Sequence, residues 1–422
     1  LHQQFYHYLI LNNCFLSICI YQKEFKRKNE KKYQCNYHLY SEEDEIQTII
    51  HHWIRILNIK LGWIQDFNKL VIKYANFFML DLFRSSSKLL NTFNKRANKL
   101  LSIDYSTFGD CQFICSGSND STVRLWDIET NQQIQSFNGH SGYVHCVKFS
   151  RYHQNNSHCN VICSSSRDKT IRFWDVKNNQ QLKLFNGHTS VVFGIEFSSF
   201  NSGRYLCSVS YDKTIRLWDV EMYKPLHVFN GYKAIFCVDI SPLQSNNNDN
   251  DNKMNNIGVI GGNGYTICSG SLDKTIRIWD IETAKEFIVF KGHNRYVSSV
   301  KYASNELGID GGANTILSGS ADTSVRLWDI RSGEQIQVFN GHTHYVCAVE
   351  YSPFVINNNE ASGCSNVICS GSRDNTIRFW DIRSNKKELY IIQGDDKEHD
   401  GVQCFKFIRL KKIKKTIMIV AV

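Results

Sequence analysis

Serine, histidine and aspartate recur close together in the second part of the chain, in the combination that nucleophilic hydrolases use. Such a triad needs one serine nucleophile, a histidine base and an aspartate that orients the histidine. His140, Ser164 and Asp168 form one such set, and equivalent sets follow further along the chain. Because an enzyme needs one nucleophile and not several equivalent ones, we interpret these residues as structural and predict no catalytic residue.

Other motifs that would indicate chemistry are absent from the sequence. It contains no GxSxG elbow, no GxxxxGK[ST] loop, no GxGxxG turn and no HExxH motif. Its 15 cysteines include no CxxC pair, and the neighbouring His51 and His52 have no further ligands at a useful spacing. We therefore expect a protein that is not an enzyme and that uses no metal and no cofactor.

The triad-like residues lie in a repeated segment. Residues 370–381 have five near-copies, at 116–127, 164–175, 208–219, 269–280 and 318–329. The turn aspartate precedes the tryptophan by six residues in every copy, and 14 residues separate that tryptophan from the next Gly-His position. The return interval to the next tryptophan varies from 30 to 47 residues, so one connection per repeat carries the length variation.

Each copy has the pattern of four short strands. In the second copy these are residues 143–149, 161–164, 170–174 and 181–185. A repeated unit of four strands over about 45 residues is typical of a β-propeller blade. We therefore predict an all-β propeller, with inserts between the first and second strands of its blades.

The Gly-His and Trp-Asp pairs at these spacings, such as 187–188 with 218–219, resemble the WD40-repeat family of β-propellers with G-protein-β-like repeats. The resemblance covers roughly residues 88–408 and includes six complete copies. It implies a hydrogen-bonded tetrad in four blades: His140, Ser164, Asp168 and Trp174; His188, Ser208, Asp212 and Trp218; His293, Ser318, Asp322 and Trp328; His342, Ser370, Asp374 and Trp380. Arg96 and Tyr232 replace the histidine in the first and fourth copies, so we expect those blades to be tied less rigidly.

The two ends of the repeat region predict how the ring closes. Residues 402–408 match an innermost strand, and residues 88–93 match an outer strand that has no blade before it. We therefore predict a seven-bladed propeller whose seventh blade is closed by the N-terminal strand. No seventh Ser…Asp…Trp set follows, so this blade is expected to be incomplete and residues 416–422 to form an aggregation-prone edge.

The domain organisation follows from changes in pattern. Residues 1–40 are poorly defined and include a charge run, residues 41–87 predict an α-helical hairpin, and residues 88–422 predict the propeller. The apolar faces of the hairpin would dock on the propeller or form a dimer or partner interface. The apolar segment 9–20 is too short to cross a bilayer, so no membrane span is expected.

Charge and cysteine usage limit the partners and the compartment. Residues 101–404 carry 28 Lys and Arg against 32 Asp and Glu, while both ends of the chain are basic. This repeat body is poorly suited to contact a phosphate backbone, so nucleic acid is not expected as a partner. Cysteines in apolar runs favour a reducing compartment, the cytoplasm or alternatively the nucleus. The oligomeric state does not follow from the sequence.

The resemblance implies that other proteins or peptides bind on the face around the central channel. Two sets of positions are expected there: Asn119, Arg167, Tyr211, Leu272, Ala321 and Arg373 before the turn aspartates, and Tyr143, Val191, Ile235, Tyr296 and Tyr345 three residues after the histidine position. From these we select Arg167, Arg373, Tyr143, Tyr211, Tyr296 and Tyr345 as partner-binding candidates, because Arg and Tyr are common interface anchors. An acidic or phosphorylated segment would suit them.

Three functional hypotheses remain open. The first is a non-catalytic protein-interaction scaffold. The second is a substrate receptor of a cullin-type ubiquitin ligase, because WDxR sequences end at Arg331 and Arg383. The third is a regulatory propeller within a larger signalling protein.

Overall fold

A computed structural model describes residues 99–108, 111–157, 159–241, 265–303, 315–352, 367–383, 388–394, 401–409 and 416–421. The chain divides into two units, Leu1–Trp63 and Ile64–Val422, and every described residue belongs to the second. The predicted helical hairpin, the expected outer strand at 88–93 and Arg96 lie outside the described residues.

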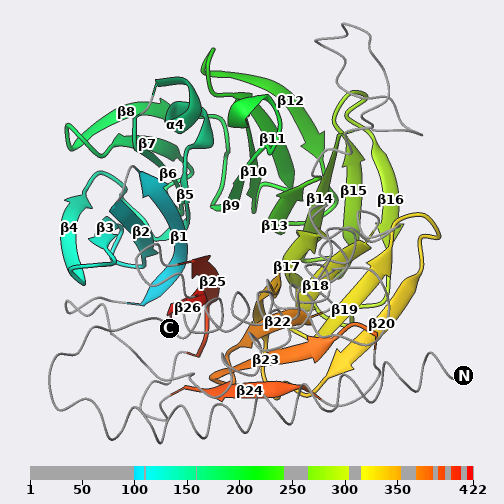
Figure 1. Cartoon of the computed structure of the whole chain (residues 1–422). Coiled ribbons are helices and arrows are strands. Elements are labelled where there is room, and N and C mark those ends of the chain that lie inside the picture. Colours follow the sequence, from blue (N-terminus) through cyan, green and yellow to red (C-terminus); the bar gives the residue numbers. More distant parts are fainter. Residues whose placement is uncertain are drawn as a thin grey trace, which may run out of the picture. The chain divides into compact units, whose positions relative to one another are not determined.

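Six four-stranded antiparallel sheets follow one another along the chain, and the strands of each sheet are hydrogen-bonded in sequence order (Figure 1). The first three blades are β1 (Leu100–Phe108), β2 (Cys111–Ser118), β3 (Val123–Asp127) and β4 (Gln132–Phe137); β5 (Val144–Phe149), β6 (Val161–Ser166), β7 (Ile171–Asp175) and β8 (Gln180–Phe185); and β9 (Val192–Phe197), β10 (Tyr205–Ser210), β11 (Thr214–Asp219) and β12 (Lys224–Asn230).

The next three blades have the same order. They are β13 (Ile235–Ile240), β14 (Thr266–Ser271), β15 (Ile276–Asp280) and β16 (Glu286–Phe290); β17 (Val297–Tyr302), β18 (Thr315–Ser320), β19 (Ser324–Asp329) and β20 (Gln335–Asn340); and β21 (Val346–Tyr351), β22 (Val367–Ser372), β23 (Thr376–Asp381) and β24 (Tyr390–Gln393). The prediction of an all-β propeller with six complete repeats is confirmed.

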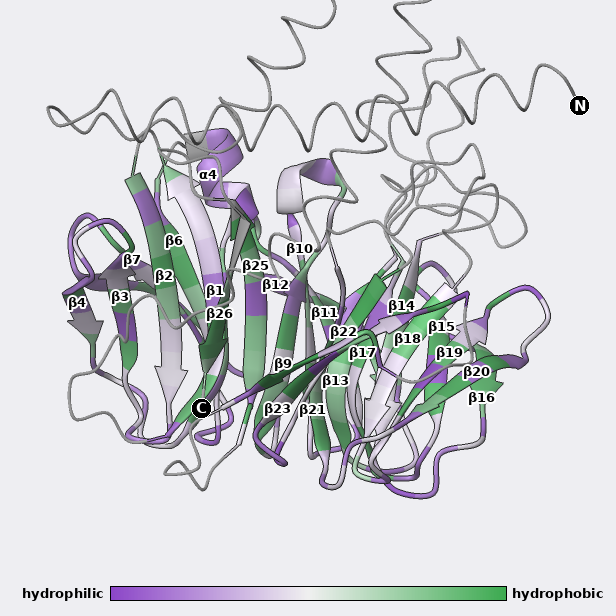
Figure 2. Ribbon diagram, turned by 60° about the horizontal axis from the view of Figure 1, so that its bottom comes forward, coloured by the Kyte–Doolittle hydropathy of each residue, from purple (hydrophilic) through white to green (hydrophobic). Residues whose placement is uncertain are grey.

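Burial changes from strand to strand within a blade because each sheet packs between two others. All residues of the second strand β6 are buried, whereas all but the last residue of the outermost strand β8 are exposed. Hydrophobic stretches accordingly occupy the inner strands, and hydrophilic loops lie at the blade ends (Figure 2). The five cysteines at the same place in the second strands are free and buried, as small apolar side chains would be: Cys115, Cys163, Cys207, Cys268 and Cys369.

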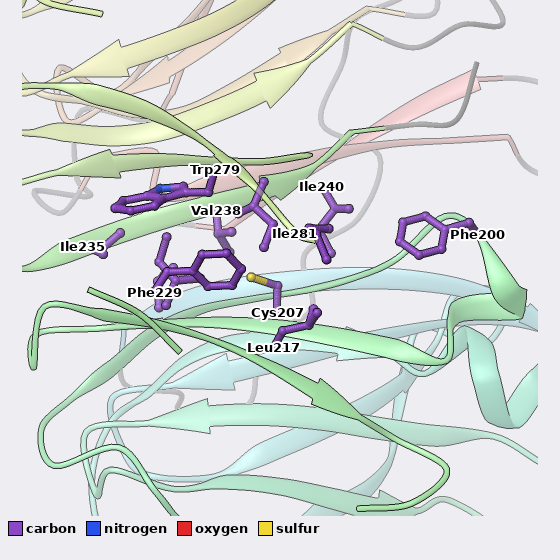
Figure 3. Packing of buried hydrophobic residues seen from close by; sticks show 12 residues of the cluster. Phe200, Cys207, Leu217, Phe229, Ile235, Val238, Ile240, Trp279 and Ile281 are labelled. Carbon is purple, nitrogen blue, oxygen red and sulfur yellow. The ribbon is translucent and has the colours of Figure 1, made fainter. Parts of the chain in front are cut away.

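Apolar clusters join each blade to the next. Between the third and fourth blades, Leu217 and Phe229 pack against Val238, Ile240 and Trp279 (Figure 3). Equivalent clusters join the other neighbouring pairs from the first blade to the sixth. The tryptophan of each repeat therefore serves both its own blade and the blade before it.

A two-stranded sheet follows the sixth blade. It consists of β25 (Cys404–Arg409) and β26 (Thr416–Ala421), paired antiparallel. Phe405 and Met418 pack against the sixth blade, while Ile419 and Ala421 pack against the first blade. The strand expected at 402–408 is therefore present as β25. Residues 416–422 were expected to form an exposed edge, and within them β26 pairs with β25 along one of its two sides.

Two connections between the first and second strands of a blade have a structure that the sequence did not predict. Residues after β5 form the short helix α4 (Arg151–Ser157), and a 3-10 turn, η1 (Asn201–Gly203), lies after β9. The Asn-rich insert at 246–256 lies outside the described residues. Within the part of the chain that the structure describes, no helix is long and apolar enough to cross a membrane.

Candidate interaction face

The four predicted tetrads are hydrogen-bonded networks in the structure. In each, the histidine Nδ1–H donates to the turn aspartate at 2.8 Å, and its Nε2 lies 2.7–2.8 Å from the serine Oγ. The tryptophan Nε1–H donates to the same Oγ at 2.7–2.9 Å. The four serines are 0% exposed, so no substrate reaches these oxygens.

The hydrogen bonds stabilise the charged form of the turn aspartates. Burial raises the pKa of Asp374, but hydrogen bonds from His342, Thr376 and the Thr343 N–H outweigh burial and hold that pKa well below its usual value. The carboxylates of Asp168, Asp212 and Asp322 have the same balance. Each carboxylate therefore links the turn between the second and third strands of its blade to the loop that precedes the first strand of that blade.

This fixed turn positions the residue that precedes the aspartate. The Arg167 N–H donates to the Tyr143 carbonyl at 2.8 Å, and the Arg373 N–H donates to the Tyr345 carbonyl at 2.9 Å. The residue after the aspartate takes a left-handed conformation, as at Lys169 with φ 73°. Each turn thus holds two residues side by side at one end of the blade, and we call the surface formed by these turns the channel face.

In the first and fourth blades, where we expected Arg96 and Tyr232 at the histidine position, an arginine of the blade itself pairs with the turn aspartate, and Arg96 lies outside the described residues. The Arg277 Nη1 donates to Asp273 at 2.6 Å, and Arg124 pairs with Asp120 in the same way. Tyr232 lies exposed with its ring 4.8 Å from the Arg277 guanidinium carbon. Arg277 therefore satisfies the aspartate from within its own blade, and it contacts the entering loop through the Tyr232 ring in place of a histidine hydrogen bond.

Aromatic side chains form a connected row across the channel face. This aromatic band consists of Tyr143, His145, Phe193, Phe236, Tyr296 and Tyr345. Successive ring centroids are 6.4, 4.9, 4.9, 5.2 and 5.9 Å apart. It crosses five successive blades, the second to the sixth.

The structure brings all six partner-binding candidates to this band. Tyr143, Tyr296 and Tyr345 are members, and the Tyr211 ring lies 6.4 Å from that of Phe193. Arg167 lies 5.2 Å from the Tyr143 ring, and Arg373 lies 5.9 Å from the Tyr345 ring. The candidates therefore share one surface with a cation at each end.

Four residues of this surface were not predicted from the sequence. His145, Phe193 and Phe236 each occupy the second position of an inner strand, in three successive blades. An aromatic ring at the same place in three consecutive copies was the signal available. Arg295 was also missed, because it precedes the expected position at Tyr296 by one residue.

Two expected face positions lie in the core instead. Ile235 is 2% exposed and packs in the cluster between the third and fourth blades (Figure 3). The loop before the fourth blade is one residue shorter, so Leu272 N–H bonds the carbonyl of Ala234 and not that of Ile235. Ala321 is also buried.

The first strands of the blades, together with β25, carry a ring of charges that was not predicted from the sequence. We call this the charge ring: Asp104, Lys148, Glu196, Asp239, Lys301, Glu350 and Lys406. Lys148 lies 2.5 Å from Glu196, Lys301 lies 3.5 Å from Asp239 and 3.9 Å from Glu196, and Lys406 lies 3.5 Å from Glu350. Each ion pair joins different blades or the β25–β26 sheet.

The pKa values show how the charge ring is balanced. Burial opposes ionisation of Glu196, but Lys148, Lys301 and Lys406 lower its pKa to about 2. Burial raises the pKa of Asp239, its neighbour of like charge, despite the attraction of Lys301. Seven positions cannot alternate in sign without one like-charged pair, and Lys301 contacts both members of that pair. Among the described residues no group of three or more His, Cys, Asp or Glu side chains is placed to hold a metal.

The WDxR arginines lie at the other end of the blades. Arg373 precedes β23, whereas Arg383 follows it, with its Nε donating to Asp381 at 3.2 Å. The Arg331 N–H donates to Asp329 at 3.0 Å after β19. Neither residue shares the channel face.

Comparison with known proteins gives one extended match and several short ones. The family profile described as WD domain, G-beta repeat matches residues 87–127, 131–175, 179–219, 223–280, 284–329 and 333–381. WD repeat-containing protein 82 of Drosophila melanogaster is 43% identical over 54 residues, covering 13% of this chain and 17% of that protein.

Two further relatives show the same partial coverage. The Lissencephaly-1 homolog of Heterostelium pallidum is 30% identical over 61 residues, 14% of this chain and 15% of that protein. The U3 snoRNP-associated protein-like YAOH of Oryza sativa is 34% identical over 55 residues, 13% of this chain and 10% of that protein. These alignments are about as long as one repeat, so they carry no activity or partner over to this chain.

Proposed function

Since the chain belongs to the WD40-repeat family of β-propellers, whose members typically serve as protein-interaction scaffolds, we propose that it is a non-catalytic scaffold. Its ligand is a protein or peptide segment that lies on the channel face, across the aromatic band. This hypothesis is favoured over an enzyme because the repeated Ser, His and Asp side chains are buried and fully engaged with one another.

The observation that carries the proposal is the aromatic band with its flanking arginines. Tyr143 and Tyr211 are 42% and 52% exposed, so these two rings are accessible to a ligand. Tyrosine and arginine are enriched at the energetic centres of interfaces. The tetrads and backbone hydrogen bonds hold these positions in place before binding, which lowers the ordering entropy that binding must overcome.

The proposal is tested by selecting ligands from a defined library of displayed peptides, with and without phosphorylated residues. Selected peptides are then titrated against Tyr143→Ala/Tyr211→Ala and against the matched control Ile134→Ala/Phe287→Ala. The control residues are 50% and 47% exposed and lie on outer strands. We expect the first pair to weaken binding at least about tenfold, as hot-spot truncations do, and the second to leave it unchanged.

Two outcomes would contradict the proposal. Equal weakening by both pairs would move the ligand away from the channel face. Weakening only by Arg331→Ala and Arg383→Ala would place it at the opposite blade end and would favour the ubiquitin-ligase hypothesis. Both arginine variants therefore belong in the same titration series.

We also propose that β25 and β26 are the inner half of a seventh blade, closed on its outside by residues 88–93, and that residues 41–87 form a separate helical extension. The packing of β25–β26 against the first and sixth blades supports the closure. A chain that begins at residue 88 should be measurably more stable to urea than one that begins at residue 94. Equal stability would contradict closure by this strand. The free buried thiols support a reducing compartment, the cytoplasm or the nucleus.

A further inference from the structure

One end of the aromatic band carries two arginines on a single tyrosine. Arg295 comes from the fifth blade and Arg373 from the sixth, and each guanidinium carbon lies 5.9 Å from the Tyr345 ring centroid. The Arg295 Nη1 also donates to the Tyr345 hydroxyl at 3.2 Å. Both arginines are exposed, whereas Tyr345 is half-buried beneath them.

The turn aspartates of the fifth and sixth blades are already engaged elsewhere. Both oxygens of Asp374, the residue after Arg373, accept hydrogen bonds from His342, Thr376 and the Thr343 N–H. Asp322 is held in the same way by the tetrad of the fifth blade. Across the described ranges, neither Arg295 nor Arg373 forms an ion pair. Their positive charges therefore remain available to a ligand.

A third cation reinforces the same end of the face. The Lys99 carbonyl accepts the Asn119 N–H at 3.0 Å. In the sixth blade the Tyr345 carbonyl accepts the Arg373 N–H in the equivalent bond. Lys99 therefore occupies the matching position in the first blade. Burial raises the pKa of the Cys347 thiol, while the charges of Arg373 and Lys99 act against that increase. Both cations thus lie near Cys347, which follows Tyr345 by two residues.

We propose that Arg295, Arg373 and Tyr345 form a phosphate-binding site for a phosphorylated serine or threonine in the peptide that lies on the channel face. This inference rests on the proposed function. Two guanidinium groups and a hydroxyl offer more donors than one carboxylate uses, and they match the double negative charge and three free oxygens of a phosphate. The adjoining rings of Tyr296 and Phe236 then receive apolar side chains of the same peptide.

The charge distribution favours a phosphopeptide over a nucleic acid. A nucleic acid needs positive charge along its whole path, and residues 101–404 carry more acidic than basic side chains. The aromatic band itself consists of rings, and the guanidinium groups that lie against its tyrosines are Arg167 at one end and Arg295 and Arg373 at the other. The charge ring on the inner strands contains four acids and three lysines, so it adds no net positive charge.

The test uses three degenerate peptide pools of the form Ala-X3-Z-X3-Ala, where Z is phosphoserine, serine or glutamate. Fluorescence polarisation measures their affinity for the full chain, for Arg295→Gln/Arg373→Gln and for the matched control Arg383→Gln. We expect the phosphoserine pool to bind about 10- to 100-fold more tightly than the serine pool, the range for hydrogen bonds to charged groups. The double variant should abolish that difference, and Arg383→Gln should preserve it.

Several outcomes would overturn the inference. Equal affinity for the phosphoserine and serine pools, or a phosphate preference that survives in the double variant, would show that these arginines bind no phosphate. Displacement of the phosphopeptides by a uridine 12-mer at lower concentration than by free phosphopeptide would identify a nucleic-acid site instead. If the serine pool binds and Tyr143→Ala/Tyr211→Ala weakens it, the scaffold function stands although the phosphate site fails. If no pool depends on the channel face, the scaffold proposal itself fails.

Discussion

The tetrad serines allow one stability prediction to be worked out closely, because the chain contains its own control. Ser370 Oγ accepts the Trp380 Nε1–H at 2.9 Å and lies 2.7 Å from His342 Nε2. Ser269 Oγ accepts the Trp279 Nε1–H at 2.8 Å, but Tyr232 replaces the histidine in that blade. Both serines are buried. The same Ser→Ala change therefore removes two hydrogen bonds in one blade and one in the other.

Leaving a buried polar group without a partner costs about 1–3 kcal/mol. Ser370→Ala strands the indole N–H and the imidazole Nε2, so it should lower the free energy of unfolding by about 2–6 kcal/mol. Ser269→Ala strands the indole alone and should lower it by about 1–3 kcal/mol. The difference between the two variants, about 1–3 kcal/mol, is assigned to the histidine.

Urea denaturation followed by tryptophan fluorescence measures both variants against the parent chain. Equal slopes of the free energy against urea concentration are required for the comparison, since a changed slope would indicate a changed unfolding transition. Equal losses for Ser370→Ala and Ser269→Ala would refute the reasoning, because the histidine would then contribute nothing through the serine.

Three further predictions concern charge and pH. Lys301→Met should destabilise the fold by about 3–5 kcal/mol because it leaves Glu196 and Asp239 without their shared lysine. Lys406→Met should have a smaller effect, and Asp239→Asn added to Lys301→Met should restore part of the lost stability. No rescue by Asp239→Asn in urea denaturation would contradict the charge-ring account. The turn aspartates have pKa values lowered by folding, so their contribution is present above about pH 3.9 and is lost as the pH falls through the lower folded values; the stability of Asp374→Asn should fall less steeply there than that of the parent. Burial and then Arg167 lower the pKa of His145 to about 4, so the unfolded chain binds more protons than the folded chain between pH 6.5 and pH 4. The free energy of unfolding should therefore decrease as the pH falls through that range, by up to about 1.4 kcal/mol per pH unit. His145→Phe should reduce this slope, measured by urea titrations at pH 7 and pH 5.

The sequence predicts the blades well because their determinants are local. A turn that buries Asp168 needs its hydrogen-bond partners at fixed distances along the chain, so the spacing to Ser164 and Trp174 identifies the second hairpin of the blade directly. The candidate face was predicted in part for the same reason, because Arg167 and Arg373 adjoin these turns. Placing Ile235 on the face was wrong because counting from Tyr232 overlooked a loop shortened by one residue.

The charge ring and the complete aromatic band depend on contacts between blades, and these are not local. Lys301 in the fifth blade contacts Glu196 in the third blade, across two blade boundaries. Inserts of variable length lie between these two strands in the sequence, so no fixed spacing relates the two residues. Arg295 and Tyr345 likewise meet only because the fifth and sixth blades pack side by side. Spacing within one repeat contains no information about which residue of the next repeat will be opposite.

The claim that the channel face binds the ligand is tested most directly by hydroxyl-radical footprinting of the full chain with a saturating selected peptide. Tyr143, Tyr211, Tyr296 and Tyr345 should lose reactivity on binding. Phe287 on the outer strand β16 and Met222 at the opposite blade end are exposed and should remain as reactive as in the free chain. Protection of Phe287 or Met222 with unchanged tyrosines would contradict the account.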